Sequence, residues 1–104
     1  MTEVNVAQEV FAAGQKRARD FAALLGIEHP VLNAPMPVEA GVELVAAVSE
    51  AGGLGVLSAA GRTPVELSKT VAAIRARTNK PFAIHLELPA KPVNPQELDA
   101  AKML

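Results

Sequence analysis

The most constraining feature of this sequence is an alternation of short apolar runs with helical stretches. Two runs, Val31–Ala34 and Gly53–Ser58, flank the amphipathic stretch Gly41–Ala51, and a third run, Phe82–Leu88, follows a further helical stretch. Short connections between such elements predict a parallel α/β sheet with right-handed crossovers. Ligands of such sheets bind at the carboxyl ends of the strands, and the first run reaches that end at Pro35.

The first expected helix runs from about Asn5 to Leu25 and stops at Gly26. We expect its apolar stripe to pack across the amino end of the sheet. The stripe consists of Val6, Val10, Ala13, Phe21 and Leu25. The basic cluster at positions 16–19 has two explanations, a solvated helix face or an anion site, and the balanced net charge favours the solvated face.

Glycines and capping signals bound the later helices. Gly41 is the best available N-cap of the second helix, and Gly52 ends it. The buried stripe expected for this helix is Leu44, Val45, Val48 and Ala51. Thr63–Glu66 is a capping box with proline at the first helical position, and Asn94–Glu97 repeats the signature before a helix expected to reach Leu104. The stripe expected after the first box is Leu67, Val71, Ile74 and Thr78.

Composition excludes several classes of function. The chain has 104 residues, a net charge of −1 and no cysteine. The balanced charge gives no basic field for nucleic acid or an anionic membrane, and no apolar run approaches the length of a membrane span. Without cysteine there are no disulfides, thiolate metal sites or cysteine nucleophiles. We therefore expect a cytoplasmic protein with a small-molecule substrate, without nucleic-acid or membrane partners.

Alternation along the third run gives a first candidate for a binding residue. Phe82, Ile84 and the later leucines share one face, whereas Ala83, His85 and Glu87 share the other. The apolar face is expected to pack under the helices, so His85 and Glu87 point to the opposite side near the carboxyl end of the strand. His85 then either contacts a ligand or is a solvated residue at the edge of an incomplete sheet.

The end of the first run gives a second candidate. Asn33 lies two residues before Pro35, and proline has no N–H with which to continue a strand ladder. A side-chain amide and free backbone groups at this edge suit a flat heteroaromatic ligand that needs a few directed hydrogen bonds. A simple turn from strand to helix is an equal explanation, in which Met36 only fills a gap in the core.

The remaining motifs predict structure and no catalytic or metal residue. Gly52–Gly55 resembles a phosphate loop, but a dinucleotide fingerprint follows a strand and opens a helix, whereas these glycines precede a strand. We interpret Gly52 as a helix stop, and Gly53 and Gly55 as providing space inside the barrel that such a sheet would build. His29 lies at the amino end of the first strand and is expected to be structural. No nucleophile–base pair and no metal-ligand cluster is visible in the sequence.

Five motifs in a fixed order resemble the amino-terminal third of the nitronate monooxygenases, formerly called 2-nitropropane dioxygenases. The motifs are Leu25–Pro30, Asn33–Met36, Glu50–Gly55, Thr63–Leu67 and Thr78–Phe82. The resemblance implies an FMN-dependent (β/α)₈ TIM barrel, of which this chain has about three βα units after an N-terminal helix. It implies domains at 1–26, the helix, and 27–104, the partial barrel.

The same resemblance implies site roles for a few residues. Ala34, Pro35 and Met36 match a segment whose backbone lies against the flavin ring, and Asn33 lies where Gln or Asn is common. His85 occupies a position where the family usually has an asparagine that hydrogen-bonds FMN, and a neutral imidazole can still donate one hydrogen bond. In the family, the catalytic histidine and the phosphate loops lie beyond position 104.

Three hypotheses about function follow. The first is the N-terminal part of a nitronate monooxygenase, which oxidises alkyl nitronates with O₂ to carbonyl compounds and nitrite; the 104 residues alone are then expected to be inactive and to bind FMN weakly. The second is a flavin-type enoyl-acyl carrier protein reductase, which shares these motifs. The third is a non-catalytic βα fragment that self-associates through its open sheet.

Overall fold

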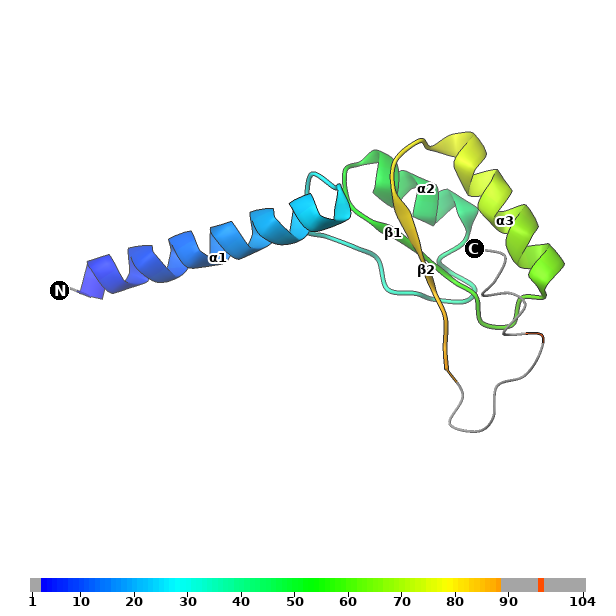
Figure 1. Ribbon diagram of the computed structural model, residues 1–104, viewed down its shortest axis with the longest axis horizontal. Helices are drawn as coiled ribbons and strands as arrows, with labels where there is room; N and C mark the ends of the chain where they lie inside the picture. The colour runs from blue at the N-terminus through cyan, green and yellow to red at the C-terminus, as the bar shows by residue number, and fades with distance from the viewer. Residues whose placement is uncertain (1–2, 89–95, 97–104) are drawn as a thin grey trace.

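The computed structural model describes residues 3–88 and Gln96. Along the chain, the helices and strands are α1 (Glu3–Leu25), α2 (Val42–Glu50), β1 (Gly55–Ser58), α3 (Pro64–Arg77) and β2 (Phe82–His85). Figure 1 shows two distinct parts: α1 extends to one side as a single rod, while residues 27–88 gather into what we call the α/β body.

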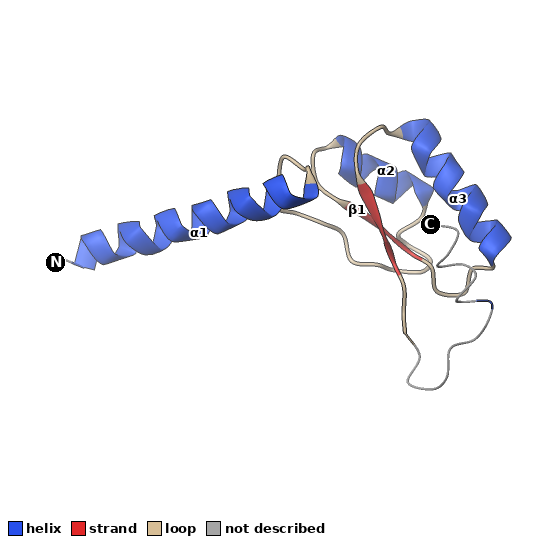
Figure 2. Cartoon of the chain, viewed as in Figure 1, coloured by secondary structure: helices blue, strands red, loops and turns tan. Residues whose placement is uncertain are grey.

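The α/β body is a parallel β-α-β unit with both of its helices on one side of the strands (Figure 2). β1 and β2 pair in parallel, with Val56 opposite Ala83 and Ser58 opposite His85. The core lies between the strands and the helices. It consists of Val45 from α2, Leu57 from β1, and Leu67 and Ile74 from α3, with Phe82 and Ile84 of β2 packed against it. The predicted α/β alternation and parallel pairing are therefore present.

α1 does not pack across the amino end of the sheet, so that prediction is wrong. The helix forms where the sequence predicts it, and Gly26 ends it with a φ of 70°. Its apolar stripe, however, is largely exposed: Val10 is 67% exposed and Phe21 is 40% exposed, and Ala22, outside the stripe, is the one buried residue among those described in this helix. The periodicity predicted a helix correctly because periodicity is a local property, whereas the packing partner is not.

The first predicted strand, Val31–Ala34, is reduced to one parallel bridge between Leu32 and Leu54. The N–H of Leu54 donates to the carbonyl of Val31 at 2.9 Å, which supplies one backbone rung. Further along the pair, the side chain of Asn33 bonds to the backbone of Val56 in place of a regular ladder. Pro30 and Pro35 have no N–H group at either end of this segment, so the strand cannot extend beyond the bridge.

Gly53 and Gly55 serve close packing of the backbone, not space inside a barrel as predicted. A Cβ at Gly53 would lie 2.7 Å from the carbonyl oxygen of Val31, and one at Gly55 would collide with the carbonyl of Val45 and lie 2.8 Å from Ser49 Oγ. The glycines therefore let the first segment and α2 approach β1. Gly52, with a φ of 99°, is the helix stop that the sequence predicts.

Ser49 is a buried residue that sequence reasoning missed. Its hydroxyl accepts a hydrogen bond from Gly55 N–H at 3.0 Å and donates to the Pro81 carbonyl at 2.9 Å, which joins α2 to both strands. The buried face of α2 is accordingly turned from the expected stripe. The buried residues are Val45, Ala46 and Ser49, whereas Leu44 and Val48 are half-buried and Ala51 is exposed.

The Thr63 capping box is confirmed. Thr63 Oγ1 accepts from Glu66 N–H at 3.2 Å, and Glu66 Oε2 accepts from Thr63 N–H at 3.1 Å. The predicted stripe of α3 is also confirmed, because Leu67, Ile74 and Thr78 are buried and Val71 packs against the core. β2 ends at His85, earlier than predicted. The second capping box lies outside the described residues except for Gln96, which is helical.

Candidate functional site at the carboxyl edge of the strands

The carboxyl ends of the three parallel segments lie side by side in chain order. Asn33 bonds to Val56 of β1, and Ser58 of β1 is opposite His85 of β2. The Ala59 N–H donates to the His85 carbonyl at 3.0 Å and continues this edge into the loop after β1. Two strand spacings, about 10 Å, therefore separate the end of the first segment from His85. The structure thus brings together the sequence-predicted positions at 33–36 and 85.

Asn33 holds the first segment against β1. Its side-chain oxygen accepts from the Val56 N–H at 2.9 Å, and its amide nitrogen donates to the carbonyls of Val56 and Ala34, each at 2.9 Å. Both amide hydrogens are thus used within the chain. The side chain fixes where Ala34–Met36 lies and has no N–H left to offer a ligand.

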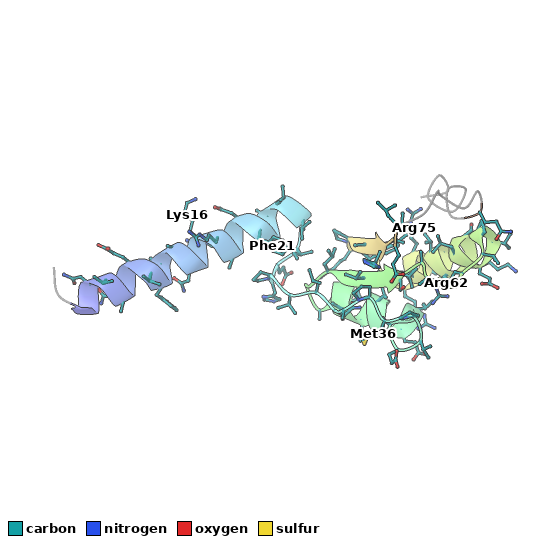
Figure 3. The ribbon with its side chains drawn as sticks, turned by 90° about the horizontal axis from the view of Figure 1, so that it is seen from below. Lys16, Phe21, Met36, Arg62 and Arg75 are labelled. Carbon is teal, nitrogen blue, oxygen red and sulfur yellow. The ribbon has the colours of Figure 1, made fainter. Side chains whose placement is uncertain are left out.

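Ala34, Pro35 and Met36 follow as a turn at the edge. The Met36 carbonyl accepts from the Ala40 N–H at 3.0 Å, which starts the path to α2. Within the described residues, the N–H groups of Ala34 and Met36 have no intrachain partner, and Pro35 has no N–H. Pro35 and Met36 are half-buried, and Met36 lies on the α/β body (Figure 3). This segment offers backbone donors at a held position.

His85 ends β2 with an exposed side chain. Phe82 and Ile84 pack against the core under the helices, so His85 belongs to the opposite, helix-free face of the strand. This orientation agrees with the predicted alternation. Glu87 was expected to share the face, but it lies beyond the end of β2 and is exposed. Within the described part of the chain, the imidazole has no hydrogen-bond partner, whereas His29 at the other end lies within 3.7 Å of Glu28 Oε2.

Arg62 is a further residue at this edge that the sequence did not single out. Its Nε donates to the Ser58 carbonyl at 3.1 Å, and Nη1 donates to Thr70 Oγ1 at 3.3 Å. The side chain therefore ties the loop after β1 to α3. An arginine four residues after a strand carries no sequence signal for this bond, which depends on how the loop folds back.

The candidate site does not coincide with the groove that the described residues form. A groove of about 1050 Å³ lies between α3 and β2, on the helix side, and Val71, Arg75 and Phe82 contribute to its lining. No group of His, Asp and Glu suited to a metal ion occurs among residues 3–88. In that same range, no helix is long and apolar enough to cross a membrane. The described residues at the carboxyl edge offer hydrogen-bond donors, the backbone N–H groups of Ala34 and Met36 and the imidazole of His85.

Comparison with known families gives this edge its context. The family model described as nitronate monooxygenase matches residues 19–104. This chain belongs to the nitronate monooxygenase family. The match contains the whole α/β body and leaves out most of α1, from Glu3 to Ala18.

Curated relatives of this family member carry more than one activity. A nitronate monooxygenase from Pseudomonas aeruginosa is 39% identical over 66 residues, which cover 64% of this chain and 19% of the relative. A (3aS,4S,5R,7aS)-5-hydroxy-7a-methyl-1-oxo-octahydro-1H-indene-4-carboxyl-CoA dehydrogenase from Mycobacterium tuberculosis is 43% identical over 67 residues, with the same coverage of 64% and 19%. The chain thus spans about a fifth of the length of these relatives.

A solved structure agrees with the sequence relationship. FabK from Thermotoga maritima superimposes with a TM-score of 0.72 at 38% identity, over 81% of this chain and 26% of that one. The nitronate monooxygenase family member therefore has the fold of the amino-terminal portion of a TIM barrel, as its sequence predicts. In that fold, the helix-free face of β2 is the barrel interior, and the carboxyl edge is the end where ligands bind.

Proposed function

We propose that this chain forms one wall of the flavin site in an FMN-dependent oxidoreductase whose substrate is an alkyl nitronate. The supporting observation is the carboxyl edge. The backbone segment Ala34–Met36, positioned by Asn33, lies two strand spacings from His85, whose imidazole has no partner among the described residues. Bound FMN would accept electrons from the substrate and pass them to dioxygen.

The residues present fit the edge of a flat ring. The Ala34 and Met36 N–H groups supply neutral donors, and a neutral His85 adds one more donor from the helix-free face. Asn33 contributes indirectly, because its hydrogen bonds to Val56 set the position of the segment. This division of roles differs from the sequence-based hypothesis, in which the amide of Asn33 itself was a candidate ligand.

A chimeric enzyme tests the proposal. Residues 27–88 replace the corresponding segment of the Pseudomonas aeruginosa nitronate monooxygenase, and the product is assayed for bound FMN and for oxidation of an alkyl nitronate. We expect stoichiometric FMN and measurable turnover. In this chimera, His85→Ala should weaken FMN binding about tenfold, the effect of losing one hydrogen bond worth about 1 to 1.5 kcal/mol. The matched control, His29→Ala, should leave FMN binding unchanged.

Two results would contradict the proposal. A correctly folded chimera without FMN would show that this edge does not fit the ring, and equal FMN affinities of the two histidine variants would show that His85 is a bystander. For the 104-residue chain alone, we expect a colourless protein without nitronate turnover. The reason is that a TIM barrel supplies its phosphate site from the loops after strands seven and eight. A yellow, stoichiometrically flavinated chain would overturn that argument.

A second candidate is a flavin-type enoyl-acyl carrier protein reductase. An activity other than nitronate oxidation is supported by the 43% identity to a carboxyl-CoA dehydrogenase, which exceeds the 39% to the nitronate monooxygenase. The two candidates share the flavin wall and differ in substrate. The chimera is therefore assayed with an alkyl nitronate and, separately, with an enoyl-CoA. Comparing the two turnover rates shows which reaction this segment supports.

A further inference from the structure

α1 carries an apolar face that no described residue of the α/β body covers. We define this α1 apolar face by its large exposed side chains, which are Val6, Val10, Phe11, Phe21 and Leu24. Leu24 is 82% exposed and Val10 is 67% exposed. By helical spacing, Glu9, Lys16 and Asp20 lie along one flank of this face, and Arg17 lies within it, seven residues after Val10 and four before Phe21. Figure 3 shows Lys16 and Phe21 on the projecting rod, away from the labelled residues of the α/β body.

The helix needs a partner for physical reasons. In proteins, most of the stability of a helix comes from packing its apolar face against other parts of the structure. Gly14 in the middle of α1 adds a penalty of about 1 kcal/mol relative to alanine. Val6, Val10 and Phe11 of this face lie outside the family match, which begins at residue 19.

The charge pattern of α1 indicates what the partner is. Its first half contains the carboxylates Glu3 and Glu9 and no basic residue, whereas its second half contains Lys16, Arg17 and Arg19 and one carboxylate, Asp20. Lys16 pairs with Asp20 at 2.9 Å, and the two arginines make no ion pair within the described residues. Two copies of such a helix attract one another when antiparallel, because each acidic half then faces a basic half, and repel when parallel.

We propose that α1 is a dimerisation helix that packs its apolar face, antiparallel, against α1 of a second copy of this chain. Burial of the exposed apolar side chains drives association, and the opposed half-charges set the orientation. This inference is independent of the proposed flavin chemistry. It names a surface of self-association other than the open sheet that the sequence predicts.

The first test locates the contact. Sedimentation equilibrium of the 104-residue chain should show a dimer, and Val10→Asp should raise its Kd on the order of 100-fold. The matched control is Ala12→Asp, which adds the same charge to the same half of the helix but two positions away, on the opposite face. It should leave the Kd within about threefold, a shift under 0.7 kcal/mol. Because both positions are exposed, β1 amide signals should show an intact α/β body in both variants.

The second test determines orientation. Replacing Glu3 and Glu9 by Lys makes both halves basic and should weaken an antiparallel dimer about tenfold or more. Adding Arg17→Glu and Arg19→Glu makes the second half acidic and should restore the affinity. An unchanged Kd in the first variant would indicate parallel helices and overturn the proposed orientation.

Other occupants of the face give different results. A monomer that co-sediments with phosphatidylglycerol vesicles would show that the face binds a membrane surface, and a monomer that binds no vesicle would show that α1 has no partner of its own kind. A dimer that survives Val10→Asp would place the contact at the open sheet. Each of these three results overturns the proposal.

Discussion

α1 and the α/β body differ in what holds them together. The body buries side chains from α2, β1 and α3 in one shared core and joins its elements with side-chain hydrogen bonds such as those of Ser49. α1 has ordinary helical hydrogen bonds, yet nearly all of its described side chains remain exposed. The family match begins at residue 19, so it includes the whole body and only the last seven residues of α1. Helix formation and tertiary packing are therefore separable in this chain, and substitutions in the two parts should behave differently.

The largest difference is expected between core and rod truncations. Leu57→Ala removes a fully buried side chain from the centre of the core and should lower the free energy of unfolding of the body by about 2–5 kcal/mol. Gln15→Ala truncates an exposed residue of α1 and should change that free energy by less than about 0.5 kcal/mol. The measurement is urea unfolding followed by the amide NMR signals of β1. Similar shifts in both variants would mean that α1 packs on the body in solution.

A methyl group added at two glycines sharpens the comparison. Gly55→Ala places a Cβ against the Val45 carbonyl and Ser49 Oγ, so α2 must move away from β1, and the body should lose about 1–3 kcal/mol. At Gly14 no atom of the described residues lies within 4 Å of an added Cβ, apart from the chain neighbours and the helix's own backbone. Gly14→Ala should therefore leave the urea midpoint of the body unchanged. A stable Gly55→Ala variant would show that α2 and β1 are farther apart than described.

The sequence predicts those features of the body that depend on local signals. Three such features are confirmed, and each depends on only a few neighbouring residues. They are the capping box at Thr63, the helix stop at Gly52, and the alternation that puts His85 and Ile84 on opposite faces of β2. The family motifs also predicted the barrel fold. The position of the candidate site follows from the same signals, because parallel strands bring their carboxyl ends to one edge.

Features that depend on distant partners were missed. The Asn33 side chain takes the place of a backbone hydrogen bond between strands, because its amide reaches Val56, 23 positions later. Ser49 can be buried because Gly55 and Pro81 supply its hydrogen-bond partners. A polar residue with such partners looks the same in the sequence as a solvated one. The predicted packing of α1 was wrong for the same reason, since an apolar stripe does not specify which residues cover it.

The next prediction concerns Asn33, whose side-chain amide makes the hydrogen bonds to Val56 that a neighbouring strand's backbone would otherwise make. Asn33→Ala leaves the N–H and C=O of Val56 without their partners and should lower the free energy of unfolding of the body by about 1–3 kcal/mol. Asn79→Ala removes an exposed amide of the same body as a control and should change it by less than about 0.5 kcal/mol. In the FMN chimera, Asn33→Ala should also loosen the ring site through the displaced Ala34–Met36 segment. Unchanged stability would mean that the amide does not serve as a rung.

The smallest expected effects come from polar pairs in the two parts. In the body, Thr78 is buried and its hydroxyl donates to Glu50 Oε1 at 2.6 Å, so Thr78→Val should lower the free energy of unfolding by about 1 kcal/mol.

In α1, Lys16 and Asp20 are both well exposed, and lysine on the N-terminal side is the weaker order for an i,i+4 pair. Asp20→Asn should therefore change the free energy of α1 helix formation by no more than a few tenths of a kcal/mol. The measurement is the circular dichroism signal at 222 nm. Salt should remove this small difference but not the effect of Thr78→Val, because solvent ions screen exposed charges and do not reach a buried hydroxyl. An Asp20→Asn effect that persists at high salt would indicate that this part of α1 is covered, as it would be if the dimer buried more of the helix than its apolar face.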